Sequence, residues 1–374
     1  MIRVFEPWIS FSNIVEVNKA LFKNQISGSS IYVKKFEDEF KKFIGMEHSV
    51  AVSNGSDALD LSFQALNLTK DDEVILPSFS IISCLSSIIR SGAKPVFADV
   101  SVETSNITLD EIKRVRTKNT KAVLVVHTYG LPADIDQIKN YCTENSLTLI
   151  EDTAEAHGMM FEGKYCGSFG DISTFSFYAN KHITSGEGGM IMTNSKKIFQ
   201  TLQQMRNLDF NNERRFVHNK FYWNSRLSGL QAALAYSQIK NISKVIYKKQ
   251  QQAAIYDSLL SQIKEISIPI KSYRGTENNY WVYGIVLKTP NLRDKLIENL
   301  YNNGVESRPF FWPLHLQPAY LNSNNAENIE LINSEYLGKN GLYLPMGAHI
   351  NEKIQKKIVN ILEKNIEELI NDDL

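Results

Sequence analysis

Short apolar segments alternate with segments of helical periodicity from about residue 50 to residue 195, and this alternation constrains the fold more than any other feature of the chain. Several apolar segments are hydrophobic throughout, which is typical of strands covered on both faces in a mostly parallel sheet. The alternation predicts a three-layer α/β domain whose ligand lies at the carboxyl ends of the strands. The predicted strands are residues 74–77, 95–99, 122–127, 147–152, 172–178 and 190–193, and the predicted helices are residues 56–68, 83–91, 134–145 and 196–206.

The pattern changes after about residue 225. Residues 227–263 form a long helical stretch that is nearly free of helix breakers, and we expect it to connect the large domain to a smaller α+β domain. We therefore predict a large domain at residues 1–240, which includes an N-terminal arm, and a small domain at residues 241–374. Within the small domain the sequence predicts a strand at 280–287, helices at 292–303 and 352–371, and a surface loop at 322–325.

Charge and composition argue against several classes of protein. The chain has 41 Lys and Arg residues and 41 Asp and Glu residues, so no excess of positive charge favours nucleic acid or an acidic membrane. No apolar run approaches the roughly 20 residues of a membrane span. The N-terminus lacks a signal-peptide core, so we expect a cytoplasmic protein. The 3 cysteines form no Cys-x-x-Cys pair and the 7 histidines no i, i+4 pair, so the sequence predicts neither a disulfide framework nor a metal site.

Lys181 and Asp152 indicate the chemistry. Lys181 follows a predicted strand in a polar run that ends in Gly-Glu-Gly-Gly at 186–189, and Asp152 ends the strand before it. Taken singly, Lys181 could be a solvated loop lysine and Asp152 a helix cap, but a surface loop needs no such crowding of glycines. A pyridoxal phosphate enzyme requires both groups, because an amine forms a Schiff base with the aldehyde and a carboxylate keeps the pyridine nitrogen protonated. The small Ala154 suits a cofactor ring lying against it.

Residues 53–59, Ser-Asn-Gly-Ser-Asp-Ala-Leu, follow a short predicted strand at 49–52 and open a helix. Free backbone N–H groups and the helix dipole attract a phosphate at such a turn, and Ser56 adds a hydroxyl. The alternative is a simple helix cap, for which Ser and Asp are good residues anywhere. The downstream Lys181 favours the phosphate site. The predicted phosphate-binding residues are Gly55, Ser56, Asp57 and Ser176.

Two segments in the second half of the chain carry candidate substrate-binding groups. Residues 222–228 place an amide, a hydroxyl and a guanidinium just ahead of the long helix, although a helix cap with an exposed arginine explains them as well. Residues 306–315 interleave three aromatic residues with Arg, His and two prolines, which is typical of a rigid binding loop; the alternative is a packed corner between the domains. Arg308 suits phosphate oxygens, and His315 suits a sugar hydroxyl or a phosphate.

Together these segments resemble the sugar-nucleotide aminotransferases of the DegT/DnrJ/EryC1/StrS family, from about residue 25 to the C-terminus. The resemblance implies the aspartate-aminotransferase fold (fold type I), pyridoxal 5′-phosphate bound to Lys181, L-glutamate as amino donor and a nucleotide-linked keto sugar as acceptor. It also implies an obligatory homodimer with shared active sites, in which Asn224 comes from the partner subunit. The motifs that carry the resemblance are residues 53–59, 92–97, 126–130, 151–156, 167–171 and 176–189.

Within the family, residues 180–189 are similar to the branch that aminates C4 of a 4-keto-6-deoxyhexose. The loop at 308–315 is similar to that of members acting on a GDP-linked sugar, which implies a role in O-antigen or other surface polysaccharide synthesis. Amination at C3, or a UDP- or dTDP-linked sugar, is an alternative, and a non-catalytic, cofactor-binding regulator is another. Related dehydratases have histidine where Lys181 stands, so the lysine favours amino transfer.

Two positions depart from the family pattern. Ile81 stands where an aromatic residue usually stacks on the cofactor ring. Without that aromatic ring, the site loses about 0.5–1.5 kcal/mol of stacking energy. Ser225 replaces a usual tyrosine. The predicted catalytic residues are Lys181 and Asp152; the predicted cofactor-binding residues are Gly55, Ser56, Asp57, Ile81, Asp152, Ala154, Ser176, Lys181 and Asn224; and the predicted substrate-binding residues are Glu187, Arg226, Arg308, Phe310 and His315.

Overall fold

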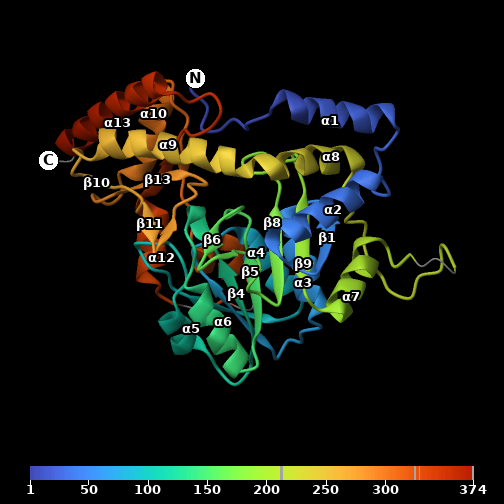
Figure 1. Ribbon diagram of the computed structural model, residues 1–374. Helices are drawn as coiled ribbons and strands as arrows, with labels where there is room; N and C mark the ends of the chain where they lie inside the picture. Colours follow the sequence, from blue (N-terminus) through green and yellow to red (C-terminus); the bar gives the residue numbers. More distant parts are fainter. Residues whose placement is uncertain (211–213, 324–325, 328, 373–374) are drawn as a thin grey trace.

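A seven-stranded sheet forms the centre of the molecule (Figure 1). The computed structural model describes residues 1–210, 214–323, 326–327 and 329–372. The sheet order is β1-β9-β8-β5-β4-β2-β3; the strands from β8 to β3 run parallel, and β9 is antiparallel to both β8 and β1. The strands are β1 (His48–Val52), β2 (Glu73–Pro77), β3 (Lys94–Ala98), β4 (Thr120–Val126), β5 (Thr148–Asp152), β8 (Ile172–Ser176) and β9 (Gly189–Thr193).

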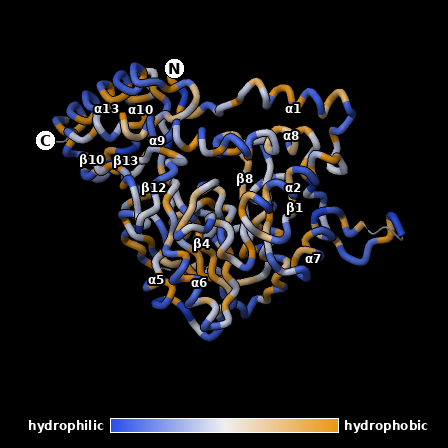
Figure 2. The backbone as a smooth tube through the Cα atoms, in the orientation of Figure 1, coloured by the Kyte–Doolittle hydropathy of each residue, from blue (hydrophilic) through white to orange (hydrophobic). Residues whose placement is uncertain are grey.

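Helices cover both faces of this sheet, because its strands are apolar on both. Along β4, Leu124 and Val126 belong to the core under α3, α4 and α7, whereas Val123 and Val125 belong to the core under α5 and α6. Figure 2 shows hydrophobic residues gathered around β4. The predicted three-layer α/β architecture is confirmed. The helices are α2 (Ile31–Ile44), α3 (Gly55–Ala65), α4 (Ile82–Arg90), α5 (Leu109–Val115), α6 (Ile135–Glu144), α7 (Lys196–Arg206) and α8 (Gly229–Gln238).

The long helical stretch predicted at 227–263 forms two helices joined end to end. A single 3-10 turn, η2 (Ile239–Asn241), connects α8 to α9 (Ile242–Leu260), and Figure 1 shows the pair as a yellow rod along one side of the molecule. The N-terminal helix α1 (Phe11–Phe22) lies alongside α8. Residue 240 falls inside η2, and the domain boundary placed there stays a prediction.

A smaller antiparallel sheet, ordered β10-β13-β15-β14, follows α9. Its core residues Tyr283 and Leu342 pack with Leu296 of α10 and Leu362 of α13. The elements of this region are β10 (Ile266–Ser267), β13 (Tyr283–Leu287), β14 (Arg308–Pro309), β15 (Gly341–Leu344), α10 (Arg293–Asn302), α11 (Pro318–Leu321), α12 (Ile332–Asn340), α13 (Glu352–Asp372) and the 3-10 turn η3 (Leu314–Leu316).

Two details differ from the sequence prediction. The strand predicted at 280–287 begins only at Tyr283, because Tyr280 adopts φ 48°, which interrupts an extended chain. In the loop predicted at 322–325, Asn322 and Ser323 follow α11, and residues 324 and 325 lie outside the described residues. The remaining short elements are η1 (Thr128–Gly130), β6 (Met160–Phe161), β7 (Lys164–Tyr165), β11 (Ser272–Tyr273) and β12 (Thr276–Glu277).

Candidate active site

A cavity of about 390 Å³ opens at the carboxyl ends of the central parallel strands. Val126, Asp152 and Ser176, which end β4, β5 and β8, all line it. The ligand site was predicted at this edge of the sheet, because loops that follow parallel strands meet there. The predicted site residues that line this cavity are Gly55, Ser56, Ile81, Asp152, Ala154, Ser176, Lys181 and Glu187.

The amine of Lys181 is buried between a carboxylate and an indole ring. Its Nζ lies 3.7 Å from Oε1 of Glu155 and 3.9 Å from the centre of the Trp281 ring. Burial lowers the pKa of Lys181, and the charges of Glu155 and Asp152 oppose that shift. The amine is therefore closer to losing its proton than an exposed lysine would be, which is the state a nucleophile or general base requires.

The carboxylate of Asp152 is also buried, and no described cation forms an ion pair with it. Its Oδ1 accepts a hydrogen bond from the Ala154 N–H at 3.1 Å, and its Oδ2 lies 3.6 Å from the Cys84 Sγ. Burial raises the pKa of Asp152, whereas the Ala154 N–H and the charge of Lys181 oppose the rise. A buried carboxylate in this state favours a cationic or N–H-bearing ligand group.

A second, fully hydrogen-bonded carboxylate fixes the end of β5. Glu151 accepts N–H groups from the 167–170 turn and faces Nε2 of His127 at 3.0 Å. Because the Ala133 N–H donates to Nδ1 of His127, the ring carries its proton on Nε2 and donates it to Glu151. These hydrogen bonds fix the end of the strand that carries Asp152 and so fix the position of Asp152 in the site.

The turn at the start of α3 approaches the lysine segment closely. Oδ1 of Asn54 caps the helix by accepting the Asp57 N–H at 2.8 Å. A Cβ at Gly55 would lie 2.7 Å from the Ser176 Cβ, so only glycine fits there. Ser56 lines the cavity, but Asp57 does not: its carboxylate is hydrogen-bonded to the Ser53 hydroxyl.

Like Asp57, the predicted residues Asn224, Arg226 and Arg308 lie outside the catalytic cavity of their own chain. Asn224 is exposed, and its Oδ1 accepts the Arg226 N–H. Arg226 lines a separate cavity of about 630 Å³ together with Arg206 and Arg215. Arg308 lines a neighbouring cavity of about 370 Å³ and pairs with Glu306 at 2.7 Å. The residues shared by that cavity and the catalytic one are Tyr178, Asn180, Trp281 and Tyr343.

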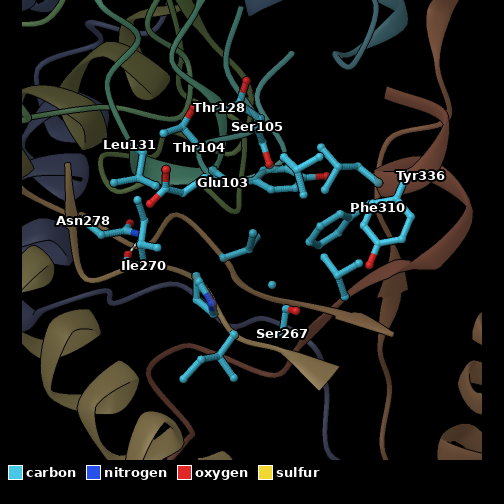
Figure 3. Close-up of a pocket in the computed structure, with 18 residues that line it drawn as sticks. Glu103, Thr104, Ser105, Thr128, Leu131, Ser267, Ile270, Asn278, Phe310 and Tyr336 are labelled. Atoms are coloured by element: carbon cyan, nitrogen blue, oxygen red, sulfur yellow. Dashed lines mark hydrogen bonds between the residues drawn. The ribbon is translucent and has the colours of Figure 1, made fainter. Parts of the chain in front are cut away.

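Phe310 and His315 lie in packed surroundings and do not line the catalytic cavity. Phe310 is buried where Gly284 and Gly341 leave room for its ring, and it lines a different cavity of about 380 Å³ (Figure 3). His315 is buried, with its Nδ1 2.6 Å from the Ser78 hydroxyl. For these two residues the geometry matches the packed interdomain corner, the alternative to a binding loop.

Sequence reasoning did not single out Glu155 or Trp281. Glu155 accepts the Tyr129 N–H at 2.9 Å, and burial raises its pKa to about 7. A second acid three residues after Asp152 was the available signal for it. Trp281 donates from its Nε1 to the Asn180 carbonyl at 3.1 Å. No sequence signal marked it, because it lies within a segment that was predicted to be a strand.

Comparison with known proteins places this site in a family. Residues 9–363 match the DegT/DnrJ/EryC1/StrS aminotransferase family. The chain belongs to this family. It is a pyridoxal-phosphate-dependent aminotransferase of fold type I, as the resemblance implied.

Relatives and solved structures extend over nearly the whole chain. GDP-perosamine synthase of Vibrio cholerae is 37% identical over 97% of this chain and 98% of its own length, and that of Escherichia coli O157:H7 is 34% identical over 92% and 93%. An aminotransferase from Streptoalloteichus hindustanus superposes with a TM-score of 0.92 at 27% identity, covering 99% of this chain and 100% of its own. An E. coli GDP-4-keto-6-deoxy-D-mannose-3-dehydratase with bound hydrated pyridoxal phosphate superposes with a TM-score of 0.87 at 25% identity. The match covers 97% of this chain and 99% of the dehydratase chain.

The residues of the cavity fit pyridoxal phosphate. A buried amine, a buried carboxylate and a helix N-terminus face one space, and Gly55, Ser56 and Ser176 line it where a phosphate could meet the start of α3. Among the residues that the structure describes, no group of three or more His, Cys, Asp or Glu could hold a metal ion. No described helix is long and apolar enough to cross a membrane.

Proposed function

We propose that this protein transfers the amino group of L-glutamate to C4 of a GDP-linked 4-keto-6-deoxyhexose, the reaction type of GDP-perosamine synthase. The observation that carries the proposal is that relatives with this name, from three organisms, are 32–37% identical over at least 91% of this chain. The presence of Lys181 in the cavity supports amino transfer rather than dehydration. We further propose that the protein acts in the cytoplasm in O-antigen or related polysaccharide synthesis.

Lys181 and Asp152 carry the proton transfers in this proposal. When bound, pyridoxal phosphate draws electrons from the carbon that bears the amine and so makes its proton acidic. The Asp152 carboxylate holds a proton on the pyridine nitrogen, for which its burial without a paired cation suits it. With the cofactor bound, the Lys181 amine would serve as the general base and acid: it would remove the proton from the Cα of glutamate and, in the reverse direction, return a proton to the sugar carbon that receives the amine.

Glu155 lies beside Lys181 and can accept a proton from its amine. Burial raises the pKa of Glu155 to about 7 and lowers that of Lys181, so burial brings the proton affinities of these two groups, 3.7 Å apart, closer together and favours proton exchange between them. Trp281 covers the amine on another side and excludes water from it. The lysine therefore gains and loses its proton in a dry site.

Neutral groups bind the phosphate in this proposal. The first N–H groups of α3 at Gly55 and Ser56 lie at the positive end of the helix dipole, and the Ser56 and Ser176 hydroxyls donate to phosphate oxygens. Lys181 is the one described Lys or Arg side chain that lines this cavity. Ile81 and Ala154 present apolar faces to the ring, and Glu187 lies where it can meet the sugar.

We propose a homodimer with shared active sites. Asn224 is exposed, and its neighbours Phe221 and Trp223 are exposed as well, Phe221 fully and Trp223 by 81%. On α1, Phe11 and Phe22 are exposed by 80% and 85%. Large apolar side chains gathered on a surface mark an interface. In the dimer Asn224 contacts the cofactor phosphate of the partner, and Arg226 and Arg308 remain candidates for the sugar nucleotide.

One experiment tests the donor, the acceptor and the position of amination together. The protein with bound cofactor is treated with L-glutamate to bleach its visible absorption and then with GDP-4-keto-6-deoxymannose, or with the UDP- or dTDP-linked counterpart. We expect the band to return with the GDP sugar, and NMR of the product to show the amine at C4. Amination at C3, or return of the band with another nucleotide only, would contradict the substrate assignment.

Two other activities are outcomes of the same experiment. Loss of the C3 hydroxyl without amination would indicate dehydration, as in the E. coli structural neighbour. A regulatory role has support from a relative named pleiotropic regulatory protein in Geobacillus stearothermophilus, 32% identical over 88% of this chain. Failure of L-glutamate to bleach the band would favour that role, whereas bleaching without recovery on any of the three keto sugars would leave the enzyme class standing and the substrate assignment wrong.

A further inference from the structure

The turn that brings Trp281 to the amine of Lys181 is strained. Tyr280 has φ 48°, a left-handed conformation that is unfavourable for a bulky residue and persists only where the surroundings fix it. The neighbouring backbone is also tightly packed, because a Cβ at Gly130 would lie 2.6 Å from the Tyr280 nitrogen. The position of the indole over Lys181 therefore depends on the groups that hold this turn.

Groups from three other segments hold the turn, together with its own Asn278. The Asn279 N–H donates to the Gly130 carbonyl at 2.9 Å, and the Asn279 carbonyl accepts Nε2 of His182 at 3.0 Å. The Tyr280 N–H donates to Oδ1 of Asn278 at 2.7 Å. Among the described residues, the next two carbonyls, of Tyr280 and Trp281, accept side-chain hydrogen bonds from a single amine. That amine is Nζ of Lys249 on α9, at 3.1 and 2.8 Å.

Burying Lys249 beside this turn costs free energy of desolvation. It has 1% of its surface exposed, and no described carboxylate forms an ion pair with it. Burial and the charge of Lys181 lower its pKa to about 7. The other titratable group facing it is His182, whose pKa burial and Lys249 both lower. A buried amine, charged or neutral, is destabilising unless its N–H groups are hydrogen-bonded, and the carbonyls of Tyr280 and Trp281 accept those bonds here.

We propose that Lys249 is a positioning residue for amino transfer: by clamping the carbonyls of Tyr280 and Trp281, its amine keeps the indole of Trp281 on the amine of Lys181. The indole is also fixed at its other end by the Asn180 carbonyl, the residue just before Lys181. Lys249 thus acts through Trp281 without touching the reacting atoms. The inference rests on the proposed function of Lys181, but the position of the indole is measured independently of turnover.

The test follows the Trp281 ring directly. The holoenzyme is labelled with 5-fluorotryptophan, and the Trp281 signal is assigned by its loss in Trp281→Phe. In Lys249→Met we expect this ¹⁹F signal to shift or broaden, and in Lys249→Arg to return toward its original position. Lys248→Met, which removes an exposed amine one residue away on α9, is the matched control and leaves the signal unchanged. Should Lys249→Met not fold, Lys249→Gln, whose shorter side chain keeps an NH2 group, gives the same comparison.

A double-mutant cycle then ties the position of the indole to catalysis. We expect Lys249→Met to lower kcat by about 10- to 100-fold, the loss that small misplacements at a reacting centre cause. In a Trp281→Phe background the same change is expected to cost little more, because the residue it acts through is already gone. An unmoved ¹⁹F signal in Lys249→Met, or fully additive losses, would overturn the proposal. Absence of aminotransferase activity in the wild type would instead overturn the proposed function, and the ¹⁹F result would still decide the clamp.

Discussion

The ionic contact between Lys181 and Glu155 makes a quantitative prediction for Glu155→Gln. The substitution keeps the shape of the side chain and an oxygen to accept the Tyr129 N–H, but removes the charge that faces Lys181 Nζ at 3.7 Å. At an effective dielectric constant of about 20, two unit charges at this distance interact by about 4 kcal/mol, or about three pKa units. This is an upper limit, because Glu155, with a pKa of about 7, is only partly ionised near neutral pH.

The direction of the change in the Lys181 pKa follows from the charge of Glu155, which favours the protonated form of Lys181. Burial lowers the pKa of Lys181 and the Glu155 charge raises it, so removing that charge lowers the pKa further. We expect a decrease of about one to three units. Only the free amine reacts with an aldehyde, so the rate at which the apo-protein takes up pyridoxal phosphate rises with pH through the pKa of Lys181.

The assay is the pH dependence of that rate, followed by the growth of the visible absorption band in wild type and Glu155→Gln. The midpoint is expected at lower pH in the variant. Glu298→Gln, which removes an exposed carboxylate on α10, is the control and keeps the wild-type midpoint. An unchanged or higher midpoint in Glu155→Gln would refute the reasoning, because the carboxylate would then not be stabilising the ammonium form of Lys181.

Three further substitutions test other contacts in the cavity. Asp152→Asn is expected to keep cofactor affinity within about tenfold while lowering kcat by about 100-fold or more, measured by cofactor titration and steady-state kinetics; unchanged turnover would contradict its role. Gly55→Ala places a Cβ 2.7 Å from the Ser176 Cβ and is expected to weaken cofactor binding by about tenfold or more, with thermal unfolding showing an intact apo-protein. Ile81→Tyr is expected to tighten cofactor binding by about 2- to 12-fold through stacking, and weaker binding would show that the ring does not lie there.

The large sheet and the place of the site were predictable from local signals. Strands such as 122–127 are apolar throughout because helices cover both faces, and that pattern does not depend on distant residues. Asp152 and Ser176 end neighbouring strands, so sheet geometry alone brings them to one edge. Glycine follows Asn54 because a side chain at position 55 would collide with Ser176.

Contacts between distant segments were not predictable in this way. Trp281 reaches Lys181 only because Tyr280 leaves the strand conformation, and the residues that hold it there come from other parts of the chain. The space that buries Phe310 is created by Gly284 and Gly341 on two other strands. Aromatic residues interleaved with charges suit both a binding loop and a packed corner, so the sequence alone left the two alternatives open.

A chemical measurement tests most directly whether Lys181 holds the cofactor. Borohydride reduction of the holoenzyme fixes pyridoxal phosphate to whichever amine binds it, and peptide mass spectrometry then locates the modified lysine. The account predicts modification of Lys181 alone. Modification of Lys249, the other buried amine beside Trp281, or of a surface lysine with Lys181 left free, would contradict it.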